Sequence, residues 1–195
     1  MSTGHPSSHN ERLAARVYQR AHLSGHFVLR SGTTSDEYFD KYLFEGDPAL
    51  LREIAESLVA LLPDDADALA GLELGGVPIA TVLSQLTGLP ALFVRKQAKP
   101  YGTRKLAEGG EVAGRRLLVV EDVVTSGGQV IETCGQLRAL GADIAGVLCV
   151  IDREAGGMAN LAADGLKLHS LFTMSSLTAA ASRTGSPGPR RDGQD

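Results

Sequence analysis

The chain has 195 residues, of which 43% are hydrophobic, and it carries a formal net charge of −4 at pH 7. A chain of this length and composition can bury one hydrophobic core, so we expect a single domain. The acidic balance argues against a nucleic-acid-binding protein that works through a broad basic surface, and no nucleic-acid partner is expected.

Cysteine content and hydropathy exclude further classes of protein. Two cysteines, Cys134 and Cys149, are too few for a disulfide framework or a zinc site, and they are typical of small core residues in a reducing cytosol. No apolar run approaches the ~18 residues of a membrane span. The first ten residues lack the basic start and apolar stretch of a signal peptide. We therefore expect a cytoplasmic protein with no membrane partner.

The N-terminal part begins with a polar segment, residues 1–10, which we expect to be a flexible tail. Apolar residues at helical spacing then predict a helix over 11–24. Two short strands are predicted at 27–30 and 38–42, on either side of a Gly- and Ser-containing turn. Asp47 and Pro48 are typical of a helix start, and this helix is expected to run to about residue 62.

From residue 68 onward, apolar runs alternate with helical patterns. The predicted strands are 68–74, 91–95, 116–121, 145–151 and 167–172, and the predicted helices are 77–87 and 128–140. This alternation indicates an α/β fold with a parallel sheet flanked by helices. The domain is expected to span residues 11–174. Residues 175–195, rich in Ser, Gly, Pro and Arg toward their end, are predicted to be a disordered tail.

The most informative motif follows the predicted strand at 116–121. An apolar run leads into two carboxylates, Glu121 and Asp122, and then into the turn Thr125-Ser126-Gly127-Gly128, which opens a helix. Glycine turns and helix N-termini bind anions through backbone N–H groups, whereas carboxylates suit sugar hydroxyls or a metal. The motif therefore predicts a sugar-phosphate site. It lacks the lysine of a GxxxxGK[ST] loop and the GxGxxG spacing of dinucleotide folds. The alternative is an ordinary strand–turn–helix junction.

Two further segments sit where an α/β sheet places ligands, at the carboxyl ends of its strands. Gly75 and Gly76 lie in a turn that opens a helix, so this turn is either a second anion site or a tight packing turn. Five cations fall within the eleven residues 95–105, and residues 97–110 show no regular periodicity. That stretch predicts a mobile lid over an anionic ligand, and a solvated surface loop is the alternative.

Taken together and in this order, the motifs resemble the type I phosphoribosyltransferases. Within them, the segments 27–40 and 95–102 and the pair Asp152-Arg153 resemble the orotate phosphoribosyltransferases. The resemblance implies the type I phosphoribosyltransferase fold, a central mainly parallel sheet flanked by helices with a small N-terminal hood, which here would be formed largely by residues 20–45. It also implies phosphoribosyl transfer from 5-phosphoribosyl-1-diphosphate (PRPP) to orotate, giving orotidine 5′-monophosphate in de novo pyrimidine synthesis.

The resemblance also implies roles for individual residues. The catalytic residues would be Lys99, Asp122 and Glu121, with Lys99 stabilising the charge that builds on the leaving pyrophosphate. The PRPP-binding residues would be Arg95, Lys96, Lys99, Tyr101, Glu121, Asp122, Val123, Val124, Thr125, Ser126, Gly127, Gly128, Gly75 and Gly76. The orotate-binding residues would be Thr125, Arg153, Arg30, Tyr38 and Phe39.

Cofactor and assembly are implied in the same way. Mg²⁺ would be held mainly by PRPP, with Asp122 a candidate contact through water and no site fixed by the protein alone. The active unit would be a homodimer in which the basic loop reaches the neighbouring site. Gly75, Arg30, Tyr101 and Glu121 depart from residues common in the family, which leaves open a phosphoribosyltransferase for another base. A non-catalytic regulator of the same fold that senses PRPP or a nucleotide is a further alternative.

Overall fold

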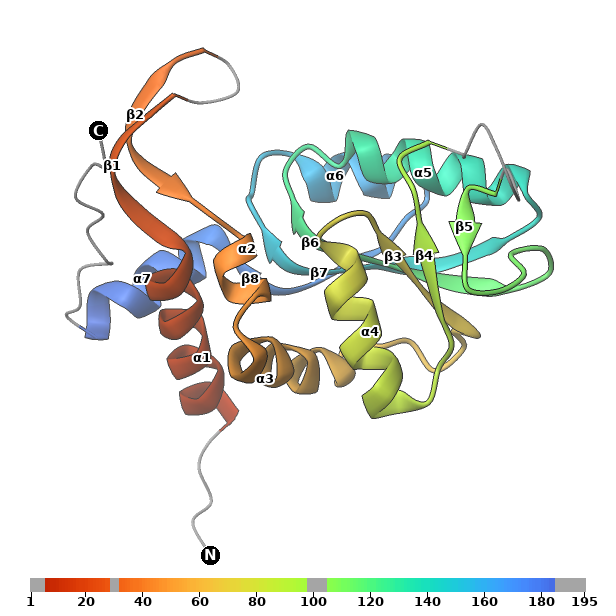
Figure 1. Ribbon diagram of the computed structural model, residues 1–195, viewed down its shortest axis with the longest axis horizontal. Helices are drawn as coiled ribbons and strands as arrows, with labels where there is room; N and C mark the ends of the chain where they lie inside the picture. Colours follow the sequence, from red (N-terminus) through yellow and green to blue (C-terminus); the bar gives the residue numbers. More distant parts are fainter. Residues whose placement is uncertain (1–5, 29–31, 98–104, 185–195) are drawn as a thin grey trace, which may run out of the picture.

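The computed structural model describes residues 6–28, 32–97 and 105–184. Its centre is a six-stranded sheet of order β5-β4-β3-β6-β7-β8 (Figure 1). The parallel strands are β3 (Ala68–Leu72), β4 (Ala91–Val94), β6 (Arg116–Val124), β7 (Asp143–Asp152) and β8 (Leu168–Thr173). The short β5 (Ala107–Glu108) pairs antiparallel to β4. The predicted α/β fold with a mainly parallel sheet is confirmed.

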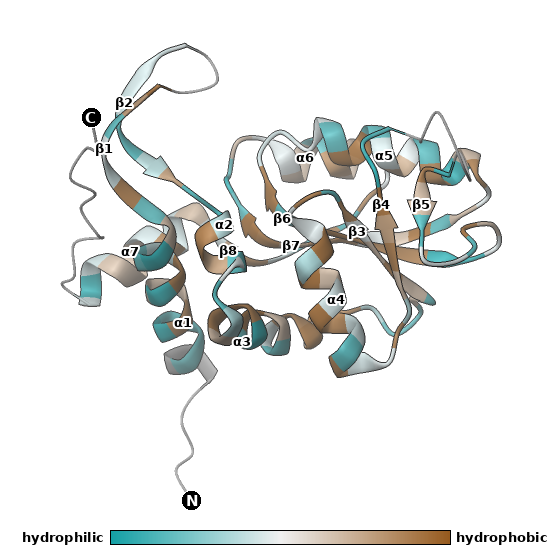
Figure 2. Cartoon of the chain, viewed as in Figure 1, coloured by the Kyte–Doolittle hydropathy of each residue, from teal (hydrophilic) through white to brown (hydrophobic). Residues whose placement is uncertain are grey.

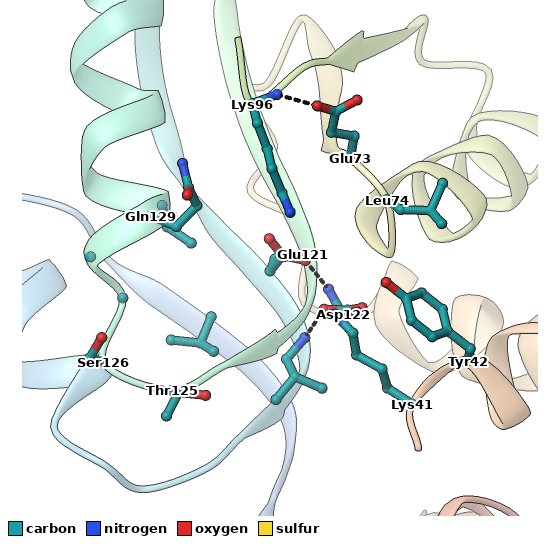
Figure 3. Close-up of a pocket in the computed structure, with 15 residues that line it drawn as sticks. Lys41, Tyr42, Glu73, Leu74, Lys96, Glu121, Asp122, Thr125, Ser126 and Gln129 are labelled. Atoms are coloured by element: carbon teal, nitrogen blue, oxygen red, sulfur yellow. Dashed lines mark hydrogen bonds and ion pairs between the residues drawn. The ribbon is translucent and has the colours of Figure 1, made fainter. Parts of the chain in front are cut away.

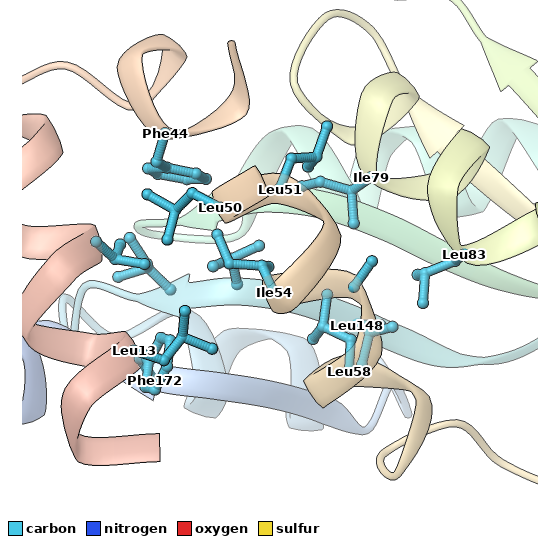
Figure 4. Close-up of a cluster of buried hydrophobic side chains, with 14 of the residues drawn as sticks. Leu13, Phe44, Leu50, Leu51, Ile54, Leu58, Ile79, Leu83, Leu148 and Phe172 are labelled. Atoms are coloured by element: carbon cyan, nitrogen blue, oxygen red, sulfur yellow. The ribbon is translucent and has the colours of Figure 1, made fainter. Parts of the chain in front are cut away.

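Helices cover both faces of this sheet, which is why its central strands are apolar throughout. One face packs on α3 (Pro48–Val59) and α4 (Gly76–Thr87), and the other on α5 (Gly128–Ala139) and α6 (Gly157–Ala163). Neighbouring residues of β6 alternate between the two cores: Leu118 and Val120 join the first, and Leu117 and Val119 the second. Figure 4 shows the first core, where side chains of α3 and α4 meet Leu148 of β7.

The N-terminal part adds a smaller unit beside β8. Helix α1 (Pro6–Ala21) leads into the antiparallel hairpin of β1 (His22–Val28) and β2 (Thr34–Phe39), and α2 (Tyr42–Glu45) follows. The hairpin projects from the body of the molecule in Figure 1. All five residues of β3 are buried, whereas none of the six residues of β2 is. Figure 2 shows the same contrast in hydropathy.

Part of each expected tail is helical. Helix α1 begins at Pro6, so residues 6–10 belong to a helix and not to a flexible segment. At the other end, residues 174–184 form α7 (Met174–Thr184), which packs against α1 through Leu177 and Ala180. The prediction of a disordered 175–195 is therefore wrong for 175–184, and residues 185–195 lie outside the described part of the chain.

The physical reason for α7 is a set of capping bonds and small apolar residues. Ser176 and Thr173 exchange side-chain-to-backbone hydrogen bonds at the start of the helix, at 3.0 and 3.1 Å. The Glu154 carboxylate accepts bonds from the Ser175 backbone N–H and hydroxyl, both at 2.8 Å. These bonds satisfy N–H groups that a helix start leaves unpaired. Because the buried face consists mostly of Leu and Ala, composition alone did not reveal it.

Other predicted helix and strand boundaries differ from the observed ones by a few residues. The first helix ends at Ala21 because the following residues pair in the hairpin, and the helix predicted to reach residue 62 ends at Val59. The short α6 and β5 were not predicted. Within the described residues, no helix combines the length and the apolar character that crossing a bilayer requires.

Candidate active site

A cavity of about 350 Å³ opens at the carboxyl end of β6 (Figure 3). It is lined by Lys41, Tyr42, Glu73, Leu74, Lys96, Glu121, Asp122, Val123, Val124, Thr125, Ser126, Gly127, Gly128, Gln129 and Val130. All eight residues of the predicted segment 121–128 are therefore gathered around one cavity. The parallel sheet explains the position, because ligand sites in such folds lie outside the carboxyl ends of the strands.

The turn between β6 and α5 presents polar groups to this cavity. Gly127 adopts φ 78° and precedes the first turn of α5, a left-handed conformation that glycine takes without a steric penalty. The first N–H groups of a helix have no intrahelical acceptor and, with the helix dipole, favour an anion. The side chains of Thr125 and Ser126 are exposed beside them. This end of the cavity is suited to a phosphate group.

Helix α6 supports the same turn from behind. The Asn160 side-chain amide donates to the Ser126 carbonyl oxygen at 2.9 Å. A Cβ atom placed on Gly157 would lie 2.5 Å from the Thr125 carbonyl oxygen, so the backbones of α6 and the turn are in close contact. The turn is therefore held by contacts that do not depend on a ligand.

The two acidic residues have different environments. Asp122 is fully buried, and its Oδ2 lies 2.5 Å from the Lys41 ammonium. Burial alone would raise the pKa of Asp122, but contacts with Glu121, Glu45 and Lys41 outweigh it and lower the pKa. Burial would lower the pKa of Lys41, and the contact with Asp122 reverses that effect. Asp122 and Lys41 therefore form an ion pair in which the carboxylate is buried and the ammonium is partly exposed.

The other two carboxyls of this cluster hold their protons. Burial, reinforced by the contact with Asp122, raises the pKa of Glu121 to about 9. The same two causes raise the pKa of Glu45, on α2, to about 9. Burial and the neighbouring Asp122 carboxylate thus favour the protonated forms of Glu121 and Glu45. Glu121 can donate a hydrogen bond as well as accept one.

The turn after β3 forms the opposite wall. Glu73 and Leu74 line the cavity, and the Lys96 backbone N–H donates to Glu73 Oε1 at 2.5 Å. The predicted Gly75 and Gly76 stand behind this wall and do not line the cavity. A Cβ on Gly76 would lie 2.1 Å from the Val120 carbonyl oxygen, so this glycine permits close helix–strand packing. The geometry shows that Gly76 has a packing role, and the predicted anion-binding role of Gly75 and Gly76 stays a prediction.

The basic segment is placed only in part. Lys96 lines the cavity, but Arg95 does not, and its Nε lies 3.8 Å from Glu108 Oε1 at the edge of the sheet. Arg30, Lys99 and Tyr101 fall outside the described residues. Their predicted roles stay predictions.

A second cavity, of about 390 Å³, lies at the base of the hairpin. It is lined by Tyr18, His22, Ser35, Glu37, Tyr38, Phe39, Arg153, Met174 and Thr178. The structure thus brings Tyr38, Phe39 and Arg153 together, whereas Thr125 lies in the first cavity. A backbone hydrogen bond connects the walls of the two cavities, because the Arg153 N–H donates to the Val124 carbonyl oxygen at 2.9 Å.

Sequence reasoning missed several residues of the two cavities: Lys41, Tyr42, Glu73, Leu74, Gln129 and Val130 in the first, and Tyr18, His22, Ser35, Glu37, Met174 and Thr178 in the second. Glu73 could have been found, because it is a carboxylate at the end of a predicted strand. No local signal marks Lys41 or Tyr18, since each reaches its cavity through long-range packing. In the described part of the chain, no group of three or more His, Cys, Asp or Glu side chains is arranged to hold a metal.

Comparison with known proteins agrees with this geometry. Residues 46–167 match the family model of the phosphoribosyl transferase domain. An orotate phosphoribosyltransferase of Nocardioides sp. is 55% identical over 86% of this chain and 94% of its own length. One from Pyrococcus horikoshii is 44% identical over 80% of this chain and 86% of its own.

Solved structures show the same relationship. The orotate phosphoribosyltransferase of Mycobacterium tuberculosis, in complex with Fe(III) dicitrate, superposes with a TM-score of 0.78 at 32% identity and covers 87% of this chain and 98% of its own. Its complex with PRPP gives a TM-score of 0.75 at 29% identity, with coverage of 87% and 99%. The sequence matches, the sheet topology and the position of the cavity lead to one conclusion: this chain belongs to the type I phosphoribosyltransferases, in the orotate phosphoribosyltransferase family.

Proposed function

We infer that the protein is an orotate phosphoribosyltransferase of pyrimidine biosynthesis, a pentosyltransferase acting on PRPP. The observation that carries this inference is the polar cavity at the end of β6, where an acidic pair adjoins a glycine turn at a helix N-terminus. The 55% identity to the Nocardioides enzyme specifies the acceptor as orotate. In the reaction, orotate N1 bonds to the anomeric carbon of the ribose, the bond to the pyrophosphate oxygen breaks, and the proton of N1 is released.

The 5-phosphate of PRPP would occupy the turn. Backbone N–H groups of residues 125–128, the hydroxyls of Thr125 and Ser126, and the positive end of the α5 dipole all suit a dianionic phosphate. Because α6 already fixes this turn, binding requires little rearrangement of it. The phosphate contacts would anchor the substrate and contribute ground-state binding.

The ribose would lie against the acidic pair. Glu121, protonated and facing the cavity, can both donate to and accept from the 2- and 3-hydroxyls. Asp122 supplies negative charge beside the ribose, which favours an oxocarbenium-like transition state over the neutral ground state. The two residues thus orient the sugar and stabilise the positive charge that develops on it.

The pyrophosphate would extend toward the turn after β3 and Lys96. Negative charge builds on this group as its bond to the anomeric carbon breaks, so cations placed there accelerate the reaction. Lys96 is one such cation. Lys99, three residues further on, is proposed as the second, with Tyr101 as a hydrogen-bond donor and Arg95 closing from the side of β5.

The residues around the cavity suit Mg²⁺ carried by the substrate. Mg²⁺ is commonly bound through one or two carboxylates together with substrate phosphates, and Asp122 provides one such carboxylate at the cavity without a protein cage. When bound, the ion would offset the charge of the pyrophosphate. We propose that Asp122 contacts it through water.

Orotate would be recognised by the second cavity and the end of β7. Arg153 presents a forked donor that matches a carboxylate, and the rings of Tyr38 and Phe39 suit a flat pyrimidine. The chain turn around Arg153 is fixed because Asp152 accepts from the Glu154 N–H at 2.9 Å and Glu154 in turn binds Ser175. Thr125 and Arg30 complete the proposed set. A cytoplasmic homodimer, with the basic loop of one subunit reaching its partner's site, stays part of this proposal.

The decisive experiment follows the loss of orotate absorbance when purified protein is mixed with orotate, PRPP and Mg²⁺. We expect turnover with orotate and none with adenine or uracil, and Lys99→Ala should abolish it. Turnover with another base would overturn the assignment of substrate. PRPP binding without turnover of any base would support a non-catalytic sensor instead.

A further inference from the structure

The position of the Asp122 side chain is fixed by steric fit as well as by charge. A Cβ atom on Gly75 would lie 1.6 Å from Asp122 Oδ2 and 2.3 Å from its Cγ. The carboxylate therefore fills the slot that a side chain at position 75 would occupy. Because neighbouring residues of a strand point to opposite faces, Glu121 cannot share this slot. Asp122 is held in one orientation between the turn after β3 and the end of β6.

A carboxylate buried in this way needs a compensating charge. Removing one partner of a buried ion pair leaves an uncompensated charge, which is far more disruptive than the loss of an exposed pair. Lys41 provides this charge from outside the sheet, at 2.5 Å, while its own side chain is only 34% exposed. Glu45, which lies four residues later and is also buried, packs against the same carboxylate.

Lys41 is itself fixed by the N-terminal unit. The preceding residue, Asp40, donates its backbone N–H to the Ala21 carbonyl oxygen at the end of α1, at 2.8 Å. Asp40 Oδ1 accepts from the Tyr42 N–H at 3.1 Å, which sets the chain direction through Lys41. The ion pair thus connects the base of the hairpin with the acidic end of β6.

We propose that Lys41 is a positioning residue of the phosphoribosyl site, which acts through Asp122. Its ammonium holds the Asp122 carboxylate in one orientation. The two acidic residues thereby take different roles, Asp122 as an anchored carboxylate and Glu121 as the residue that faces the cavity. The inference rests on the proposed function for its substrate, PRPP. It predicts that the hairpin unit controls binding at the phosphoribosyl end as well as at the orotate end.

The test is a double-mutant cycle on PRPP affinity, measured by titration calorimetry with Mg²⁺ and without orotate. Lys41→Met and Asp122→Asn are each expected to weaken PRPP binding about 10- to 100-fold. Because Lys41 acts through Asp122, the double variant should bind no more than about threefold worse than Asp122→Asn alone. If the fold-losses in PRPP affinity of the two single variants multiplied in the double variant, the proposal would be overturned and direct contact between Lys41 and the ligand would be indicated. Unchanged affinity in Lys41→Met would also overturn it.

Controls separate this role from a structural one. Lys167→Met removes an exposed lysine that precedes β8, at the opposite edge of the sheet, and should leave affinity unchanged. Lys41→Arg should recover most of the affinity. If Lys41→Met does not fold, the double variant, which buries no lone charge, still gives the comparison with Asp122→Asn. Since the readout is PRPP binding, an error in the assignment of orotate would leave this test intact.

Discussion

The two ends of the site are built on different physical principles. The phosphoribosyl end sits at the edge of a parallel sheet whose strands are buried, and backbone contacts fix its turns. The hairpin end rests on a two-stranded ribbon with few buried residues, and side chains from α1, α7 and the end of β7 complete it. Most residues of the first end come from one contiguous segment, 121–130. The second depends on how distant segments pack.

The largest effect is expected from disturbing the backbone of the phosphoribosyl end. Gly76→Ala would place a Cβ 2.1 Å from the Val120 carbonyl oxygen, a clash with a main-chain atom that no side-chain rotation can relieve. Overpacking of this kind costs about 3 kcal/mol, or a fall in Tm of about 10 °C for a chain of this size. Thermal unfolding monitored by circular dichroism measures it.

Gly135→Ala is the matched control for that prediction. Gly135 is exposed on α5, and a Cβ placed on it would have nothing within 4 Å, so alanine should leave Tm unchanged or raise it slightly. Equal Tm values for the two variants would show that the turn tolerates displacement, and the contrast between the two ends would then fail.

The second prediction separates the ends kinetically. Arg153→Ala removes the proposed carboxylate partner and should raise KM for orotate about 10- to 100-fold, the range expected for a charge-assisted hydrogen bond. Ser126→Ala should instead raise KM for PRPP, about tenfold, and leave KM for orotate within about threefold. Steady-state kinetics with each substrate varied in turn distinguishes the patterns.

An exposed arginine provides the comparison. Arg52 pairs with Glu56 on the surface of α3, at 2.9 Å, and its replacement by alanine should alter neither KM. If Arg153→Ala raised KM for PRPP as strongly as KM for orotate, the two cavities would have to be treated as one.

The last prediction concerns Glu45, at the contact between the two ends of the site. The pKa of Glu45 is raised to about 9 in the folded protein from an ordinary value of 4.5. Between these values the unfolded chain releases a proton that the folded chain retains, so stability falls as the pH rises from about 5 to 9. Glu45→Gln cannot ionise in either state. Its Tm should equal that of the wild type near pH 5. Near pH 8.5 its Tm should be higher, with each kcal/mol of difference in stability raising Tm by roughly 3 °C.

Glu132→Gln, on the exposed side of α5, is expected to change Tm at neither pH. A Glu45→Gln variant displaced equally at both pH values would show that Glu45 is ionised in the folded protein and that the cluster carries a second anion.

Sequence prediction succeeded where function depends on a contiguous segment. Residues 121–128 all line one cavity because strand, turn and helix follow one another directly. Prediction failed for Lys41 because its partner lies 81 positions along the chain, and only the folded structure brings Lys41, which precedes α2, to Asp122 of β6. Helix α7 escaped notice because Ser and Ala dominate it and its caps come from Glu154 and Thr173.

The seven-residue α6 has a consequence beyond the support of one turn. Asn160 and the close approach at Gly157 order the turn during folding, before any ligand arrives. The conformational entropy of that loop is therefore lost once per folding event and not once per catalytic cycle. Helix α6 lines neither cavity. Substitutions in it should nevertheless weaken phosphate binding by loosening the empty site, and they should do so through faster release more than through slower capture.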